Sequence, residues 1–390
     1  MDAVRLAIIG GILLLSGVLA VVFGVLPVES ALAIGDRVWP ILLFVVAVTI
    51  VAELAAIAGV FDVASAFLAR VSRGRTWVLW ALTVVLAILA TAFLSLDTTA
   101  VLLTPVVIAS ARAHRLDPLP FAFATVWLAN TASLVLPVSN LTNLLALAPL
   151  GHPSPGEFVA LMGAPALVAI AVTVVLLVLV HRRGLRGRFE PAPSPAVADA
   201  VQLRVAAVVV VVLLPLLVSG LPPWIPASIA AVVLLAFFAW RSPAVVRFSL
   251  VPGSLVVFAA GLFLAVGALE AWGSAAIVAA AAGHGEALVD LMRLAGTGML
   301  GANAINNLPA YLALESAASS SPDRVAALLI GVNAGPLITP WASLATLLWH
   351  ARLTAVGVVV PWGRFVLLGL IAAPLTVALS VLALWALRGA

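Results

Sequence analysis

Long apolar segments alternate with short polar ones along this chain, at the spacing of helices that cross a membrane. Apolar runs of about 20 residues follow one another, which is the length that a spanning helix needs. Two of these runs, residues 119–148 and 324–350, contain Pro, Asn, Ser and Thr where a plain spanning helix has none. The pattern predicts an all-α polytopic membrane protein with two irregular helices.

The composition supports this prediction and narrows the chemistry. The chain is 65% hydrophobic and only 9% charged, whereas a soluble domain carries about 25% charged residues. Cysteine is absent, which excludes disulfides and thiolate metal sites, and we expect no cofactor and no resident metal. All 19 basic residues are arginine, and they suit loops at a membrane surface rather than a nucleic-acid partner.

The arginine clusters predict how the chain is threaded. Positively charged loops stay on the cytoplasmic side, and clusters at 70–75 and 112–115 flank residues 77–110. The chain therefore enters and leaves the membrane on one side. We expect residues 77–110 to form a re-entrant hairpin with SLDTTA at its tip.

The predicted organisation has five parts. An N-terminal span covers residues 1–37, a cytoplasmic linker covers 181–204, and connecting spans cover 205–250. Repeat 1 is residues 38–180, with the hairpin 77–110 and the broken helix 119–148, and repeat 2 is residues 251–390, with a hairpin at 287–318 and a broken helix at 324–350.

The two halves share one design. LANTASLVLPVSNLTNLLAL aligns with GVNAGPLITPWASLATLLWH, which matches Asn130 to Asn333, and a looser alignment of the hairpins matches Pro105 to Pro309. The arginine threading sends the halves into the membrane from opposite sides. Inverted repeats of this kind are typical of alternating-access transporters with a site between the halves.

Prolines explain why the irregular helices are irregular. Pro137 and Pro340 remove backbone donors and break their helices, which frees N–H and C=O groups that hydrocarbon cannot satisfy. Such backbone is tolerated only against protein or a water-filled cavity. The breaks and hairpin tips therefore predict a neutral substrate site, formed by Thr98, Thr99, Asn130, Thr131, Ser133, Ser139, Asn140, Thr142, Asn143, Asn303, Asn306, Asn307, Asn333, Thr339, Ser343 and Thr346. The alternative is that these side chains only bond neighbouring helices or cap broken ones.

Acidic residues inside apolar segments are candidates for ion coupling. Asp97 lies at the predicted tip of the first hairpin, where it could cycle between protonated and ionised forms; the alternative is a helix cap without a transport role. Glu53 lies within an apolar segment, either on a proton path or paired with an arginine near the cytoplasmic face.

The motifs GVNAGPLITPWASLATLLWHARL, SLDTTAVLLTPVV, NTASLVLPVSNLTNLLAL and GSLVVFAAGLFLAVGALE resemble those of the ArsB-type arsenite and antimonite efflux permeases of the ion-transporter superfamily. The resemblance implies a multi-pass protein of the bacterial cytoplasmic (inner) membrane. It implies export of arsenite and antimonite, as trivalent hydroxides, in exchange for protons, with an optional cytoplasmic ATPase partner. A homodimer is a further expected assembly.

Two alternatives of the same superfamily remain. A dicarboxylate carrier should offer arginine or a Ser-Asn-Thr cradle in each half, but SNLTN occurs once and its counterpart is ASLAT. A sodium/proton antiporter could use Asp97 with backbone carbonyls. The sequence contains no H-E-x-x-H or G-x-S-x-G motif, so we expect a transporter and not an intramembrane enzyme.

Overall fold

The protein is described by a computed structural model that covers residues 3–190, 197–273 and 280–387. Residues 191–196 of the predicted linker and the ends of the first and last predicted segments lie outside this range. Within it the chain is helical, apart from turns and one isolated β-bridge between Arg75 and Arg188. The predicted all-α class is confirmed.

The helices of the first half begin with two long ones. They are α1 (Ala3–Val22), α2 (Val28–Ile57), α3 (Val60–Val71), α4 (Thr76–Leu94), α5 (Leu96–Thr98), a π-helix (Thr99–Leu103), α6 (Thr104–Ala113), α7 (Leu119–Thr131), 3-10 turns at Ala132–Leu134 and Pro137–Ser139, α8 (Leu141–Ala146) and α9 (Pro155–His181).

The second half repeats much of this order. Its elements are α10 (Ala200–Leu217), α11 (Trp224–Arg241), 3-10 turns at Pro243–Val245 and Phe248–Leu250, α12 (Gly253–Ala271), α14 (Leu288–Ile305), α15 (Asn307–Ala318), α16 (Pro322–Ala334), α17 (Leu344–Ala355) and α18 (Trp362–Ala386).

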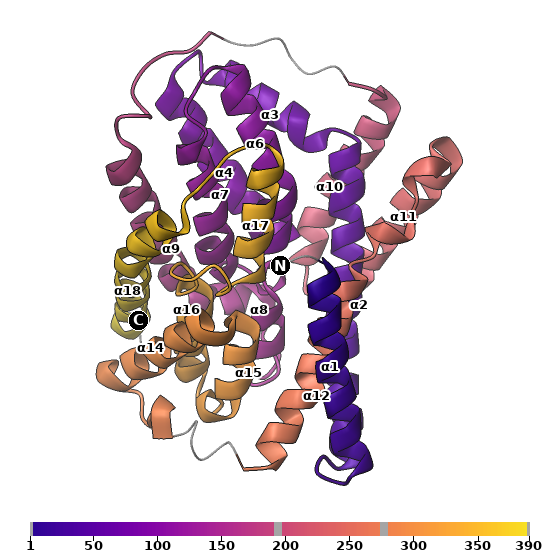
Figure 1. Ribbon diagram of the computed structural model, residues 1–390, viewed down its shortest axis with the longest axis vertical. Coiled ribbons are helices and arrows are strands. Elements are labelled where there is room, and N and C mark those ends of the chain that lie inside the picture. Colours follow the sequence, from indigo (N-terminus) through magenta and orange to yellow (C-terminus); the bar gives the residue numbers. More distant parts are fainter. Residues whose placement is uncertain (1–2, 191–196, 274–279, 388–390) are drawn as a thin grey trace.

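Two groups of helices lie side by side. Figure 1 shows α1, α2, α10, α11 and α12 on its right, with the hairpins and broken helices to their left. Within the first group α1 packs along α12. A Cβ added at Gly10 would lie 2.5 Å from Phe258 Cα, and one at Gly261 would lie 2.5 Å from the carbonyl oxygen of Gly10. These glycines therefore allow two backbones to approach as closely as helices in membranes often do.

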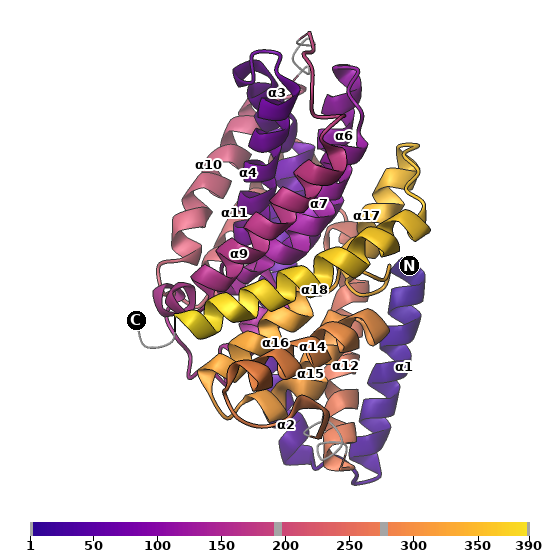
Figure 2. The same ribbon diagram turned by 90° about the vertical axis from the view of Figure 1, so that its left-hand side faces the viewer.

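The two hairpins occupy opposite ends of the molecule. Helices α4 and α6 lie in the upper part of Figure 1, and α14 and α15 lie in the lower part. Figure 2 shows α18 crossing between the upper helices, where it packs on α9, and the lower helices, where it packs on α14 and α16. This arrangement fits the predicted inversion of the halves, which stays a prediction.

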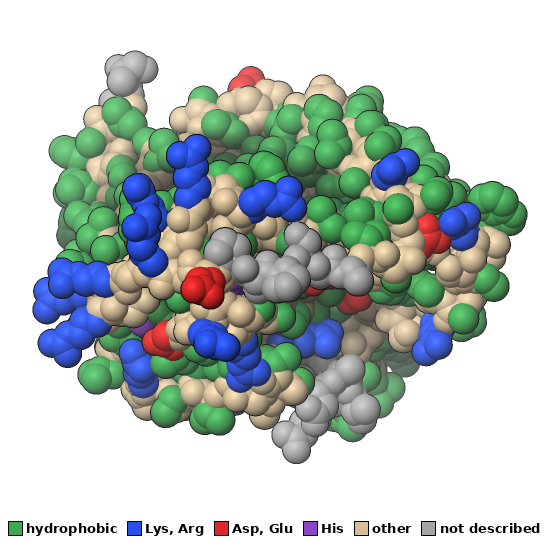
Figure 3. Space-filling view, turned by 90° about the horizontal axis from the view of Figure 1, so that it is seen from above, with side chains coloured by type: hydrophobic (Ala, Val, Ile, Leu, Met, Phe, Trp, Pro, Cys, Tyr) green, Lys and Arg blue, Asp and Glu red, His purple; other side chains and the backbone are tan. Residues whose placement is uncertain are grey.

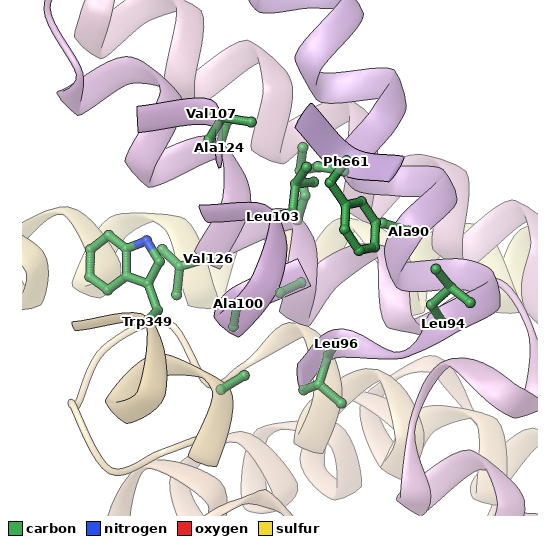
Figure 4. Packing of buried hydrophobic residues seen from close by; sticks show 14 of the residues in the cluster. Phe61, Ala90, Leu94, Leu96, Ala100, Leu103, Val107, Ala124, Val126 and Trp349 are labelled. Carbon is green, nitrogen blue, oxygen red and sulfur yellow. The ribbon is translucent and has the colours of Figure 1, made fainter. Parts of the chain in front are cut away.

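Buried apolar side chains fix the first hairpin against its neighbours. Figure 4 shows Leu96 and Leu103 of the returning arm in one cluster with Phe61 of α3, Val126 of α7 and Trp349 of α17. The indole N–H of Trp349 donates to the carbonyl of Ala122 at 2.9 Å, so this large side chain is buried with its polar atom satisfied.

Arginine side chains gather at the upper end of the molecule, which Figure 3 views from above. The ends of α3, α6 and α9 meet there, as Figure 1 shows. The first part of the linker is tied to this end, since the N–H of Phe189 donates to Gly74 O at 2.8 Å and the Phe189 ring lies 4.6 Å from that of His114. Near the end of the linker, the Arg241 guanidinium holds the pKa of Asp199 down to about 2.

Eight helical segments are long and apolar enough to cross a membrane, among the described residues. Two of them, Thr76–Leu94 and Leu96–Ala113, are the arms of the first hairpin. Their length alone would allow full spans. The tip between them lies beside a central cavity, described below, which fits a hairpin that enters and returns.

Candidate transport site

The two hairpin tips have the same unusual backbone conformation. Ser95 follows α4 with φ 90° and ψ 160°, and Asn306 follows α14 with φ 106° and ψ 154°. Only glycine adopts this region readily, so each tip is held there by its surroundings. The tips match Ser95 to Asn306, and the expected match of Pro105 to Pro309 is wrong. Pro105 lies in α6 beyond the π-helix, whereas Pro309 lies in the first turn of α15.

Each broken helix restarts at a polar residue with extended backbone. Asn140 caps α8, where its side chain accepts from the N–H of Thr142, and Ser343 precedes α17. The first break starts where α7 ends at Thr131, well before Pro137. Leu136, directly before the proline, is extended, as proline favours in its neighbour. The carbonyl of Leu337 lies against α18 so closely that a Cβ at Gly369 would be 1.9 Å away.

The tips and the restarting helices meet around one small cavity, the central cavity, of about 60 Å³. Its lining includes Ser95, Leu96 and Asp97 from the first tip and Asn306–Leu308 from the second. Asn140 and Ser343 line it from the two breaks, and α2 and α12 complete it. A volume of this size holds a few water molecules or a small polar solute.

Only part of the predicted substrate set lines this cavity. Among the predicted residues, Asn140, Asn306, Asn307 and Ser343 line it together with Asp97, and Thr98 lines a neighbouring cavity. The remaining predicted residues, which lie outside both linings, are Thr99, Asn130, Thr131, Ser133, Ser139, Thr142, Asn143, Asn303, Asn333, Thr339 and Thr346.

Several of these residues form a buried hydrogen-bond network between the two breaks. Asn333 of α16 donates to Asn143 Oδ1 at 2.8 Å and accepts from Asn140 at 2.9 Å and Thr142 at 2.8 Å. Asn143 in turn donates to the carbonyl of Ser133 at 2.6 Å. These amides are already bonded to protein, so they hold the halves together rather than offering free groups to a solute.

The other predicted residues mostly bond to backbone. Ser139 donates to Ala92 O at 2.8 Å, and Thr339 donates to Asn303 O at 2.7 Å. The Asn303 side chain accepts from the N–H of Thr339, which satisfies backbone exposed by the second break. Asn130 and Thr131 bond back to carbonyls of their own helix.

Three polar side chains on the central cavity keep free capacity. The hydroxyl of Ser343 is buried and has no hydrogen-bond partner among the described residues. Asp97 lies in the first turn of the returning arm. Its carboxylate makes no hydrogen bond or ion pair with any residue that the structure describes. Asn307 accepts from the N–H of Leu308, which leaves its amide hydrogens for a ligand.

Sequence reasoning missed two residues of this site. Ser95 forms the tip itself, where its hydroxyl accepts from the N–H of Thr98 at 3.5 Å, and no local sequence signal indicates its positive φ. Thr49 of α2 lines the central cavity, and the signal was a polar residue in the apolar part of α2, one turn before Glu53.

A larger cavity of about 650 Å³, the Arg37 cavity, lies beyond the central one. Its lining includes Arg37 of α2, the end of α8, the start of α9 and the turn between α10 and α11. Phe44, Val138 and Leu144 line both cavities, so these three apolar side chains stand between them. The arginine threading puts the Arg37 cavity on the outer side.

These features define a class of protein. A secondary transporter has the parts seen here: helices that span a membrane, two hairpins whose tips meet at a central cavity with a few polar side chains on its lining, and two helices broken at that cavity.

Comparison with known proteins gives the family. Residues 5–346 match the citrate transporter family (CitMHS). The chain is 31% identical over 384 residues to the arsenical pump membrane protein of Yersinia enterocolitica, covering 90% of this chain and 87% of that protein. It is 32% identical over 383 residues to the protein of the same name from Escherichia coli strain K12, covering 92% and 88%. The chain belongs to the citrate transporter family (CitMHS), and it is a multi-pass membrane transporter like its bacterial relatives.

A solved structure supports the fold. The YdaH transporter of Alcanivorax borkumensis, described as having an unusual topology, matches with a TM-score of 0.58 over 99% of this chain and 98% of that one. The sequence identity is 15%, so the likeness concerns the fold alone.

Proposed function

We propose that this protein exports trivalent arsenic and antimony hydroxides across the cytoplasmic membrane in exchange for protons. The observation that carries the proposal is the charge of the central cavity. Asp97 is the one ionisable side chain on its lining, among the described residues, and no arginine reaches it. A citrate or dicarboxylate anion would meet a carboxylate there and no cation, which is unfavourable in a buried site.

An uncharged trihydroxide suits the same cavity. Arsenite is a small polyol near neutral pH, and it can exchange hydrogen bonds with Ser343, Asn307 and the carboxyl of Asp97 without burying a new charge. The relatives named arsenical pump membrane proteins support this substrate class. The absence of cysteine also fits a carrier, because thiolates would hold trivalent arsenic tightly.

Coupling requires a charge that moves with the transport cycle. A neutral solute gains nothing from the membrane potential, so its accumulation needs a second ion. Asp97 supplies the group: it takes a proton from the outer side and releases it on the cytoplasmic side, and one proton enters for each substrate exported.

The test uses everted vesicles with an imposed pH gradient. Vesicles with an acidic lumen should accumulate arsenite, and labelled citrate should not enter. Asp97→Asn should abolish accumulation driven by the gradient, while counterflow of arsenite between two equal pools persists because the shape of the cavity is kept. Citrate uptake without arsenite transport would overturn the proposed substrate. Sodium-driven proton exchange without arsenite transport would instead favour the antiporter alternative.

A further inference from the structure

A second acidic side chain faces Asp97 across a separate cavity. This Glu53 cavity, of about 170 Å³, is lined by Glu53 and Thr49 of α2 and by Asp97 and Thr98 of the first tip. Pro252, Ser254 and Leu255 line it from the start of α12, and Leu344 and Leu348 line it from α17. Asp97 and Thr49 line the central cavity as well, so the two cavities adjoin at these residues.

Glu53 is not in the ion pair that its position in the sequence suggested as one alternative. The described residues contain ion pairs at Arg37–Glu315 and Arg241–Asp199, and Glu53 is in neither. Arg352, an exposed residue of α17, acts on Glu53 through its charge without an ion-pair contact. The carboxylate of Glu53 is thus half-buried and open to the cavity.

The position of Glu53 along α2 is specific. Thr49 and Glu53 are four residues apart, so they lie on one face of α2, one turn from each other. Thr49 stands where the central cavity and the Glu53 cavity adjoin, and Glu53 stands one turn closer to the end of α2 at Ile57. The arginine threading puts that end on the cytoplasmic side.

We propose that Glu53 is a proton-relay residue that passes protons between Asp97 and the cytoplasm through the Glu53 cavity. This inference rests on the proposed proton-coupled export. The cavity has room for several water molecules, and hydroxyls of Thr49, Thr98 and Ser254 line it. Protonated Asp97 gives its proton to this chain of water and hydroxyl groups, ionised Glu53 accepts a proton from the chain, and Glu53 then releases it to cytoplasmic water.

Two acidic side chains form the ends of the proposed relay. Glu53 and Asp97 are the titratable side chains on the cavity, within the described ranges, and Arg352 is the cation that acts on Glu53. The two carboxyl groups therefore lie on one cavity, with Asp97 at the substrate and Glu53 one turn of α2 closer to the cytoplasmic end of that helix. The relay therefore needs both carboxyl groups, although Asp97 alone touches the substrate.

The experiment compares two modes of transport in proteoliposomes that contain the full chain. Gradient-driven arsenite uptake moves protons through the relay, whereas counterflow exchanges arsenite with no net proton movement. Glu53→Gln should slow gradient-driven uptake by about tenfold or more, as expected when a positioned proton-transfer group is lost. Counterflow should stay within about twofold of the original protein. Glu53→Asp should restore part of the gradient-driven rate.

The matched control is Asp62→Asn. Asp62 is an acid of α3 on the same side, but it lines a different cavity, and both modes should be unchanged. Equal slowing of both modes in Glu53→Gln, or no slowing in either, would overturn the relay. If the unmodified protein transports no arsenite in either mode, the proposed function fails instead, so the two failures are distinguishable.

Discussion

The two broken helices share a shape but differ in how their polar groups are used. At the first break, Asn140, Thr142 and Asn143 are all bonded, and their partner across the interface is Asn333. At the second break, the hydroxyl of Ser343 is buried without a partner within the described structure, although it holds the same place before α17 as Asn140 does before α8.

The two hairpins differ in a similar way. The first presents an acid at its tip, whereas the second presents the amides of Asn306 and Asn307 there. One acid of the second hairpin, Glu315, lies further along α15 in an ion pair with Arg37. The first half thus supplies the bonded amides at its break and the acidic side chain at its hairpin tip. The second half supplies the unbonded hydroxyl of Ser343 and an ion pair from Glu315 to α2. The two halves are similar in backbone at their breaks and hairpin tips, but they carry different polar side chains there.

The largest expected effect concerns orientation. The chain contains no cysteine, so single cysteines can be introduced at exposed positions, Ala113 at the end of the first hairpin and Ser320 after the second. Ala113→Cys should react with an impermeant maleimide only from the cytoplasmic side and Ser320→Cys only from outside, in intact cells and in everted vesicles. Labelling of both from one side would show that the hairpins are not inverted.

The next effect concerns the hydrogen-bond network between the two breaks. Asn333→Leu removes three hydrogen bonds to the first break, which at about 0.6 kcal/mol each in a membrane protein amounts to about 2 kcal/mol of stability. Asn130→Leu, at the matching position, removes one bond to Val126 O within its own helix, and the amide oxygen that it also deletes has no hydrogen-bond partner among the described residues. Thermal unfolding in detergent should show a clear loss for Asn333→Leu and little for Asn130→Leu. An equal loss of thermal stability in both variants would contradict the different roles assigned to these two asparagines.

A smaller effect separates binding from stability. Ser343→Ala deletes a buried hydroxyl that bonds to no protein group within the described chain, so the melting temperature should not fall. Loss of its hydrogen bond to substrate should raise the apparent KM for arsenite about two- to tenfold, equivalent to about 0.5–1.5 kcal/mol. Thr346→Val is the control, because that hydroxyl is also buried without a partner but lies outside the cavity lining. A similar rise in KM for both variants would remove Ser343 from the site.

The smallest effect concerns the ion pair between Arg37 and Glu315. Arg37 and Glu315 are 35% and 15% exposed, so water screens their pair, and its loss in Glu315→Gln should cost at most about 1 kcal/mol. Hydrogen exchange should increase in α15 and stay unchanged in α4. Glu270→Gln, which removes an exposed acid near this pair, should alter neither helix. Faster exchange in both hairpins would mean that the pair acts on the whole fold.

Local signals predicted much of the fold. Apolar length and proline are properties of a single segment, and they indicated the helices and the two breaks from residues such as Pro137 and Pro340. The pairing of Asn333 with Asn143 joins residues 190 positions apart, and no local rule predicts which amides will be consumed in such a network. The sequence therefore placed more residues in the substrate site than line the central cavity. It also missed Ser95, because a positive φ at a non-glycine residue depends on packing that becomes visible only in three dimensions.

The three apolar side chains between the central cavity and the Arg37 cavity bear on energy conservation in the cell. A relay that joins Asp97 to the cytoplasm would drain the proton gradient if the same water chain continued to the outside. Phe44, Val138 and Leu144 offer no hydrogen bond to water at that point, and such narrow apolar constrictions empty of water readily. In the proposed cycle these side chains would insulate the two cavities from each other, so a proton would cross only when the hairpin tip that carries it changes the cavity to which it is exposed.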